Sequence, residues 1–306
     1  MELNTQTKIA VIMGGPGSER LISLASGKAV AEALRSRGYQ VAEVDVPGKE
    51  LVLPEGTELV YNLIHGTYGE DGEVQQQLEA LGVPYTGAGV ETSRICFDKA
   101  LSKEVFLKAG VPTPPAERFD AKGEIKPTLS LPFVVKPPRE GSSVGIHIVR
   151  EQSEVAPALE DAAKYDDHIL IEKFVKGKEL TVSILNDQAL PVIHICPRTG
   201  FYDLANKYPW LSKTGKTDYI CPADITEEET KKVQAAALAA HKAVGVEVYS
   251  RVDVLLGEDG EPYVLEINTI PGMTSSSLVP KAALAVGVEF PDLCVEIGKL
   301  SLKVSS

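Results

Sequence analysis

Hydrophobic and polar residues alternate along the first third of the chain in a way that predicts strands and helices in turn. Apolar runs typical of buried strands, and segments of helical periodicity between them, occur at 8–13, about 18–37, 41–46, 58–64 and 73–81. Strands that alternate with helices are typical of a parallel sheet with crossover connections. We therefore predict an N-terminal α/β domain over residues 1–98.

The rest of the chain predicts two further lobes. A helix at about 98–110 runs into VPTPP, whose prolines end it and mark the passage to a second lobe. In the middle of the chain, later segments predict strands at 131–138, 146–149, 168–175 and 178–185, and a helix at about 153–163. Nearer the C-terminus they predict a helix at about 227–244, a pair of strands after it, and a helical stretch from about Val279. We expect a strand-rich α+β central lobe at 99–186 and a C-terminal lobe at 187–306.

Composition and charge narrow the class of protein. The 306 residues are 43% hydrophobic and 24% charged, as in ordinary globular proteins, and no run approaches the roughly 18 uncharged apolar residues of a membrane span. A net charge of −12 would repel a phosphate backbone, so nucleic acid is not an expected partner. The four cysteines have neither metal-site nor disulfide-framework spacing, and the N-terminus lacks a signal-peptide pattern. These features favour a cytoplasmic protein that does not bind membranes.

Two glycine-rich stretches do not match common nucleotide motifs. The turn MGGPGSER follows a predicted strand and begins a predicted helix. A dinucleotide fingerprint that begins at Gly15 would need a glycine at position 20, where this chain has Arg20. The string TGKT at 214–217 would need glycine at Trp210 to complete a P-loop. A third stretch, REGSSVG at 139–145, lies between two predicted strands after Lys136. It is the pattern of a phosphate-covering flap, although a plain Gly/Ser hairpin would look the same.

The most informative segment is the strand pair near the C-terminus. Asp259-Gly260 is a strong signal for a two-residue hairpin turn, which would place Asp253 opposite Glu266 and Arg251 opposite Asn268 on one face. Opposed carboxylates repel one another unless a positive group lies between them. The other face, expected to be buried, would carry Val252, Val254, Leu265 and Ile267.

Hard oxygen ligands of this kind suit Mg²⁺ bridged to substrate phosphates, and we predict a metal site at Asp253, Glu266 and Asn268. A solvated sheet face on which Arg251 neutralises a carboxylate is the alternative. Four features point together to an ATP-grasp arrangement, in which two lobes clamp ATP. They are the hairpin with the predicted metal ligands, a strand that carries a lysine, the Gly/Ser flap and the absence of a P-loop. In this arrangement, the strand end at 172–175 could pair with adenine and Glu179 could reach the ribose.

Over nearly its whole length the chain resembles the D-alanine:D-alanine ligases. The resemblance is carried by five motifs in order: GGPGSERLISLASG (14–27), YNLIHGTYGEDGEVQ (61–75), VVKPPREGSSVGI (134–146), FYDLANKY (201–208) and RVDVLL…LEINTIPGMTSSSLVP (251–280). It implies a three-lobed ATP-grasp enzyme in which one D-alanine carboxylate takes the γ-phosphoryl group of ATP. The amine of a second D-alanine then displaces phosphate, and the dipeptide serves peptidoglycan synthesis.

The resemblance also implies roles for individual residues. Glu19 would hold the ammonium group of the first D-alanine, and Ser142 and Tyr208 would hydrogen-bond with Glu19 and close the site against water. Arg251 and the Gly272 N–H would stabilise the oxyanion of the tetrahedral intermediate. Ser277 and Leu278 would receive the second D-alanine, and His65 would help its ammonium group lose a proton.

Other residues are expected at the nucleotide. By resemblance, Lys207 would approach the transferred phosphoryl group, and Mg²⁺ would act as two ions, with Mn²⁺ as a substitute. The remaining expected ATP contacts are Lys99, Lys136, Ser142, Ser143, Glu172, Lys173, Phe174, Val175 and Glu179. A homodimer is expected as well.

The chain departs from the family pattern in three places, where the residue roles implied by the resemblance could differ. Pro16-Gly17 replaces an expected hydroxyl residue, Ser276 stands where histidine is common, and the loop after Tyr208 is longer than expected. Lys207-Tyr208 and Leu278 favour D-alanine over D-lactate or D-serine as the second substrate. A ligase for D-lactate or D-serine and a non-catalytic nucleotide or amino-acid sensor remain alternatives, whereas an NAD-dependent oxidoreductase is disfavoured by the missing glycine.

Overall fold

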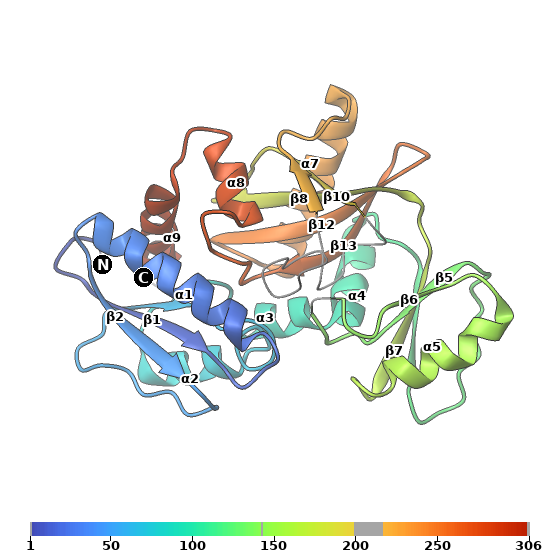
Figure 1. Ribbon diagram of the computed structural model, residues 1–306, viewed down its shortest axis with the longest axis horizontal. Helices are drawn as coiled ribbons and strands as arrows, with labels where there is room; N and C mark the ends of the chain where they lie inside the picture. The colour runs from blue at the N-terminus through green and yellow to red at the C-terminus, as the bar shows by residue number, and fades with distance from the viewer. Residues whose placement is uncertain (1, 142, 199–216, 305–306) are drawn as a thin grey trace.

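The computed structural model describes residues 2–141, 143–198 and 217–304, and within them the chain forms three sheets (Figure 1). The first is parallel, in the order β2-β1-β3, which confirms the crossover pattern. Its strands are β1 (Lys8–Gly14), β2 (Gln40–Val46) and β3 (Leu59–Asn62). Both faces of β1 are buried, because successive side chains point into two different cores.

Helices cover both faces of this sheet. One face packs against α1 (Arg20–Ser36) and α9 (Phe290–Val304), and the other packs against α2 (Glu73–Leu81). The C-terminal helix α9 therefore lies beside α1 and the first sheet, as Figure 1 shows, although residues 187–306 were assigned to the third lobe. Tyr61 fixes this contact, since its buried hydroxyl group donates to the carbonyl of Cys294 at 2.9 Å.

Two consecutive helices connect the first sheet to the rest of the protein. Helix α3 (Val90–Phe97) was not predicted, whereas α4 (Lys99–Ala109) agrees with the predicted helix at 98–110. Asp98 caps α4 by accepting from the N–H groups of Ala100 and Leu101, and Gly110 ends it in the left-handed region. Helix α4 packs against the third lobe, because Phe106 belongs to the core of that lobe.

The second sheet is antiparallel, in the order β4-β7-β5-β6. Its strands are β4 (Ala116–Asp120), β5 (Phe133–Lys136), β6 (His147–Val149) and β7 (His168–Lys173). Helix α5 (Val155–Ala162), which follows the short helix η1 (Gln152–Glu154), covers the sheet. The Gly/Ser stretch at 139–145 connects β5 to β6, as the sequence predicted. This places the flap at the edge strand of the central lobe.

The third sheet has the order β11-β10-β8-β12-β13, with β9 on β8. Its strands are β8 (Gly177–Leu185), β9 (Gln188–Ala189), β10 (Ile193–Pro197), β11 (Thr217–Ile220), β12 (Tyr249–Gly257) and β13 (Pro262–Asn268). Helix α7 (Glu227–Val244) packs on the sheet, and α8 (Leu278–Leu284) follows β13. Because β8 pairs with β12 along its length, it belongs to this sheet.

The strands place the change from the central lobe to the third lobe between Lys173, which ends β7, and Gly177, which begins β8. This lies before the boundary expected at residue 186.

The β12–β13 hairpin has the predicted pairs at the site but a different turn. Arg251 pairs with Asn268 and Asp253 with Glu266, and nearer the turn the register shifts by one. The Gly257 N–H bonds to the Glu261 carbonyl, so the loop has three residues rather than two. A bulge between Asp253 and Val254 compensates for the extra residue. Consequently Val264 is fully buried in the place expected for Leu265, which is only half-buried.

Among the helices in the described part of the chain, none combines the length and apolar character that a membrane crossing requires.

Candidate active site

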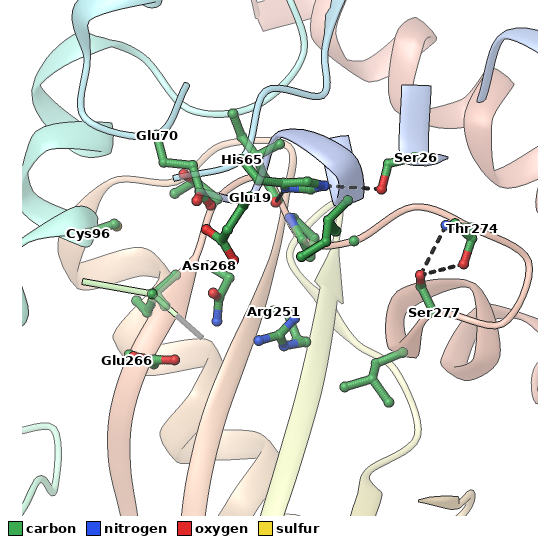
Figure 2. A pocket seen from close by; sticks show the side chains of 18 of the residues that line it. Glu19, Ser26, His65, Glu70, Cys96, Arg251, Glu266, Asn268, Thr274 and Ser277 are labelled. Carbon is green, nitrogen blue, oxygen red and sulfur yellow. Dashed lines mark hydrogen bonds between the residues drawn. The ribbon is translucent and has the colours of Figure 1, made fainter. Parts of the chain in front are cut away.

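A cavity of about 370 Å³ opens where the three lobes meet (Figure 2). It is lined by side chains from α1, from the loops after β1 and β3, from the start of α4, from β12 and β13, and from α8. The predicted site residues in its wall are Glu19, His65, Lys99, Arg251, Glu266, Asn268, Gly272, Ser277 and Leu278. Residues spread over most of the sequence are therefore gathered around one space.

Glu19 stands immediately before α1 and lines the cavity. Two glycines leave room for its carboxylate: a Cβ atom on Gly66 would lie 2.9 Å from Oε2, and one on Gly141 would lie 3.1 Å from it. Gly66 also has a φ of +71°, which favours glycine. The loop after β3 and the flap thus converge on one anionic group, which the positive end of the α1 dipole favours.

Arg251 and Asp253 form a partly buried pair on β12. The Arg251 Nε and Nη2 atoms donate to the two Asp253 oxygens at 3.0 and 2.9 Å. Thr181 on β8 donates to Asp253 Oδ1 at 2.7 Å, and the Asn268 amide lies 3.3 Å from Oδ2. Arg251 is thereby held between a carboxylate and the cavity, in the position of a fixed cationic donor.

Lys99 connects the flap to the opposite strand. Its Nζ atom lies 3.1 Å from Glu266 Oε2 and donates to the Glu140 carbonyl at 2.7 Å. Burial works to lower the pKa of Lys99, but the Glu266 carboxylate outweighs it and the pKa is raised. An ammonium group fixed in this way can meet a phosphate that enters beneath the flap.

Asp253, Glu266 and Asn268 make an oxygen-rich site that fits a divalent cation. The two carboxylates face one another across β12 and β13, and both are mostly buried. Each is balanced by a cation, Asp253 by Arg251 and Glu266 by Lys99. Two shielded carboxylates and an amide oxygen are the hard donors that Mg²⁺ prefers.

His65 is buried in the cavity wall, and both of its ring nitrogens have partners. Nδ1 lies 2.9 Å from the Ile270 carbonyl and Nε2 lies 3.0 Å from the Ser26 hydroxyl group. Burial is the largest influence and lowers the pKa of His65, while Glu19 and the Ile270 carbonyl oppose it only in part. The ring is therefore neutral near pH 7.

Glu70 is a second carboxyl group in the wall beside Glu19 (Figure 2). It accepts the Gly66 N–H at 2.7 Å. Burial and then the negative charge of Glu19 raise the pKa of Glu70 to about 8. Beside Glu19 there is thus a carboxylic acid that keeps its proton near neutral pH.

A buried ion cluster lies outside this cavity, between the central lobe and α4. Glu172 on β7 pairs with Lys136 on β5, at 2.9 Å, and with Lys103 on α4. Burial works to raise the pKa of Glu172, but the two ammonium groups outweigh it and hold the pKa below its usual value. Lys103 also donates to the Thr113 hydroxyl at 2.6 Å, and that hydroxyl donates to the Val264 carbonyl at 2.7 Å. The cluster therefore links the predicted nucleotide strand to the third sheet.

Comparison with known proteins identifies the family. A family model described as D-ala D-ala ligase C-terminus matches residues 105–298, and one described as D-ala D-ala ligase N-terminus matches residues 47–88. A D-alanine–D-alanine ligase of Methylacidiphilum infernorum is 46% identical over 294 residues, which is 96% of this chain and 95% of the relative. One of Geobacter sulfurreducens is 46% identical over 303 residues, covering 97% and 94%.

The chain belongs to the D-alanine–D-alanine ligase family.

Solved structures agree with this assignment. The D-alanine–D-alanine ligase of Bacillus anthracis complexed with ATP has a TM-score of 0.86 and 33% identity, covering 98% of both chains. The VanG D-Ala:D-Ser ligase of Enterococcus faecalis has a TM-score of 0.85 and 28% identity, covering 97% of this chain and 99% of that one. These likenesses confirm the three-lobed ATP-grasp fold that the sequence predicted.

Not every ligase residue predicted from the sequence lines the cavity. Lys136 and Glu172 lie in the buried cluster, Phe174 stacks under Arg150, and Ser143 has a φ of +61° in the flap. Lys173, Val175 and Glu179 lie at or beside the strands β7 and β8, near the junction of the two lobes. Ser142, Lys207 and Tyr208 lie outside the described residues.

Three residues of the cavity wall and the buried ion cluster were not singled out from the sequence. Ser26 is polar but shares the buried face of α1, two helical turns from Glu19, and that pattern is the signal that could have identified it. Glu70 lies within the second motif, where nothing local indicates that it is shielded. Lys103 lies one helical turn from Lys99, a spacing equally typical of a solvated helix face.

Proposed function

We propose that the protein joins two molecules of D-alanine into D-alanyl-D-alanine and converts ATP to ADP and phosphate. The carboxylate of the first D-alanine attacks the γ-phosphorus, and ADP leaves. The amine of the second, after its ammonium group loses a proton, attacks the acyl carbon, and phosphate leaves. The observation that supports this most is the single cavity that brings Glu19 together with Arg251 and Lys99 in a chain of this family.

The first D-alanine would lie between groups of opposite charge. Its ammonium group would pair with Glu19, and the oxyanion that forms at its carbonyl would meet Arg251 and the Gly272 N–H. Arg251 is fixed by Asp253, so little reorganisation is needed when the charge develops. Donors fixed in this way stabilise a tetrahedral intermediate more than they stabilise the substrate.

The second D-alanine would bind at the start of α8. Ser277 is placed for its carboxylate, and the Ser277 hydroxyl accepts the Thr274 N–H at 3.0 Å (Figure 2). The buried Leu278 beside it would contact the methyl group. The likeness to VanG makes D-serine the second candidate for this position, and D-lactate remains an alternative.

ATP would lie between the central lobe and the third sheet. Lys99 and Lys136 would contact its phosphates, and Ser143 would contribute from the flap. The other contacts expected at the nucleotide are Glu172, Lys173, Phe174, Val175 and Glu179. Ser142, Lys207 and Tyr208 keep the roles expected from the sequence, in which they close the site and reach the phosphoryl group. Exclusion of water matters because an acyl phosphate hydrolyses readily.

Asp253, Glu266 and Asn268 would hold Mg²⁺, as two ions, or Mn²⁺ in its place. The bound metal supplies positive charge that offsets the charge developing on the transferred phosphoryl group. The chain's own contribution is to hold the two carboxylates opposite one another, with Asp253 paired to Arg251 and Glu266 paired to Lys99.

The test is ATP-dependent phosphate release with D-alanine and Mg²⁺, run beside D-alanine with D-serine or D-lactate, with products identified by mass. D-alanyl-D-alanine as the main product is the expected result. A mixed product would overturn the assignment of the second substrate, and ATP binding without turnover would favour a sensor. Glu19→Gln should lower kcat/KM for D-alanine about 100-fold or more, whereas Glu32→Gln, an exposed residue on the same helix, should not.

We also propose a homodimer in the cytoplasm, where ATP and peptidoglycan precursors are available. The four cysteines are free thiols, which agrees with a reducing compartment. Sedimentation at micromolar concentration checks the assembly, and a monomer alone would contradict it.

A further inference from the structure

Two hydrogen bonds enclose the short segment that carries the proposed oxyanion donor. Residues 270–273 connect β13 to the region before α8, and Gly272 lies inside this segment. The carbonyl of Ile270 meets His65 Nδ1 at 2.9 Å, and the N–H of Met273 donates to Ser26 Oγ at 3.2 Å. The segment is therefore fixed at both ends, on either side of Gly272.

The donor and acceptor in each of these bonds follow from elementary chemistry. A carbonyl oxygen has no proton, so His65 Nδ1 must carry the hydrogen. In a neutral ring Nε2 then has only a lone pair, and the Ser26 hydroxyl donates to it at 3.0 Å. The oxygen of Ser26 keeps lone pairs for the Met273 N–H. The three hydrogen bonds that connect Met273, Ser26, His65 and Ile270 can therefore form together, because each one joins a donor to an acceptor.

The four groups are shielded from water, which makes these hydrogen bonds stronger than they would be in water. Their residues are exposed by no more than 5%, the largest value being that of His65. The charged groups that influence the ring are Glu19 and Arg251, and their effects oppose one another. Burial lowers the pKa of His65, in agreement with a neutral ring of fixed tautomer.

The arrangement joins two functions on one helix. Glu19 stands immediately before α1, and Ser26 lies on this helix about two turns further along. Figure 2 shows both side chains at the cavity. Helix α1 would thus hold the ammonium group of the first D-alanine and also set the position of the donor that faces its carbonyl. A displacement of a catalytic donor by about 1 Å can lower a rate about 100-fold.

We propose that Ser26 and His65 are positioning residues, which hold the Gly272 N–H in place for the condensation step. This inference rests on the proposed function. It also replaces the base role expected for His65, because neither ring nitrogen has a lone pair left for the ammonium group of the second D-alanine.

The variants separate positioning from proton transfer. Ser26→Ala removes the hydroxyl group and leaves the Met273 N–H without its acceptor. Ser26→Thr keeps the hydroxyl group. His65→Asn keeps an N–H for the Ile270 carbonyl but has no titratable group, whereas His65→Leu has neither. Ser23→Ala is the matched control, because Ser23 is also a buried serine of α1 that makes two hydrogen bonds, at 2.7 Å to Gly14 and 2.6 Å to Leu63.

Two measurements distinguish the two steps of the reaction. Positional isotope exchange in ATP with D-alanine reports phosphoryl transfer, and dipeptide formation reports the whole reaction. Ser26→Ala should lower kcat for the dipeptide about 10- to 100-fold, leave KM for ATP unchanged and keep isotope exchange within about threefold. Ser26→Thr should recover most of the loss, and Ser23→Ala should show no such difference between the two measurements.

The outcomes decide between the roles. In the positioning role His65→Asn stays well above His65→Leu in kcat, and the acid limb of its pH–rate profile does not move. An inactive His65→Asn, or an acid limb that disappears with the ring, would show that His65 is the base and overturn the proposal. Equal loss of both steps in Ser26→Ala would do the same. Wild-type protein without isotope exchange or dipeptide would instead contradict the proposed function itself.

Discussion

Lys103→Met removes one of the two cations that surround Glu172 and keeps the aliphatic stem. The side chains of Lys103 and Glu172 are only 5% and 4% exposed, so their ion pair is screened very little. A hydrogen bond to a charged group contributes about 1.5–3 kcal/mol, and removal of one partner of a buried pair costs about 3–5 kcal/mol when nothing replaces it. Because Lys136 still contacts Glu172, we expect a loss of about 2–3 kcal/mol in the free energy of unfolding.

The effect on ATP should be separate from the effect on stability. In the proposed role, Lys136 turns to an ATP phosphate while Lys103 continues to balance Glu172, to which both lysines are paired. In the variant, Lys136 would leave a buried carboxylate without a cation, so it should stay on Glu172. An affinity loss of about 1.4–2.8 kcal/mol would raise KM for ATP about 10- to 100-fold.

Steady-state kinetics and urea unfolding check both expectations. KM for ATP is measured at saturating D-alanine, and KM for D-alanine should change far less. Lys108→Met is the matched control, because Lys108 is an exposed lysine on the same helix. Combination with Glu172→Gln should recover part of the lost stability, since the carboxylate charge is then gone. An unchanged KM for ATP in a destabilised variant would refute the idea that Lys103 frees Lys136.

Two further predictions concern Glu70 and Gly66. The pKa of Glu70 is raised to about 8, so its contribution to stability is greatest below about pH 4.5 and is lost as the pH rises through about 8. Compared with Glu70→Gln, the wild type should lose unfolding free energy by at most about 1.4 kcal/mol per pH unit in that window, and parallel curves would contradict this. Gly66→Ala should raise KM for D-alanine about tenfold, because its Cβ atom would lie 2.9 Å from Glu19 Oε2. Gly287→Ala has a similar positive φ but open space around it, so an equal rise in KM there would exclude contact with Glu19 as the cause.

The carboxylate hairpin shows how far local sequence can lead. Asp259-Gly260 correctly located a turn, and the pairing of Asp253 with Glu266 was confirmed. The loop nevertheless contains one residue more than predicted, with Gly260 at a φ of +76°, and a bulge restores the register before the site. Turn residues indicate that a chain reverses, whereas the bulge depends on how Val264 packs into the core between the sheet and α7.

The sequence indicated less clearly which lobe each strand or helix belongs to. The pattern of β8 and the helical period of α9 were both recognised, yet β8 pairs with β12 and α9 packs against the first sheet. A strand's periodicity indicates that one or both faces are buried, but it does not identify the partner. The hydroxyl of Tyr61 and the carbonyl of Cys294 come together only after the chain has passed through all three lobes.

The sequence by itself determined most of the order of strands and helices, the ligase motifs and nine of the residues that line the cavity, because periodicity, turn chemistry and motif spacing act over short stretches. Only the tertiary structure decided the tautomer of His65, the retained proton of Glu70 and the balance of Lys103 and Lys136 on Glu172. Each of these depends on loss of water and on charges from segments far apart in the chain. Their physical effects appear only when folding brings those segments together.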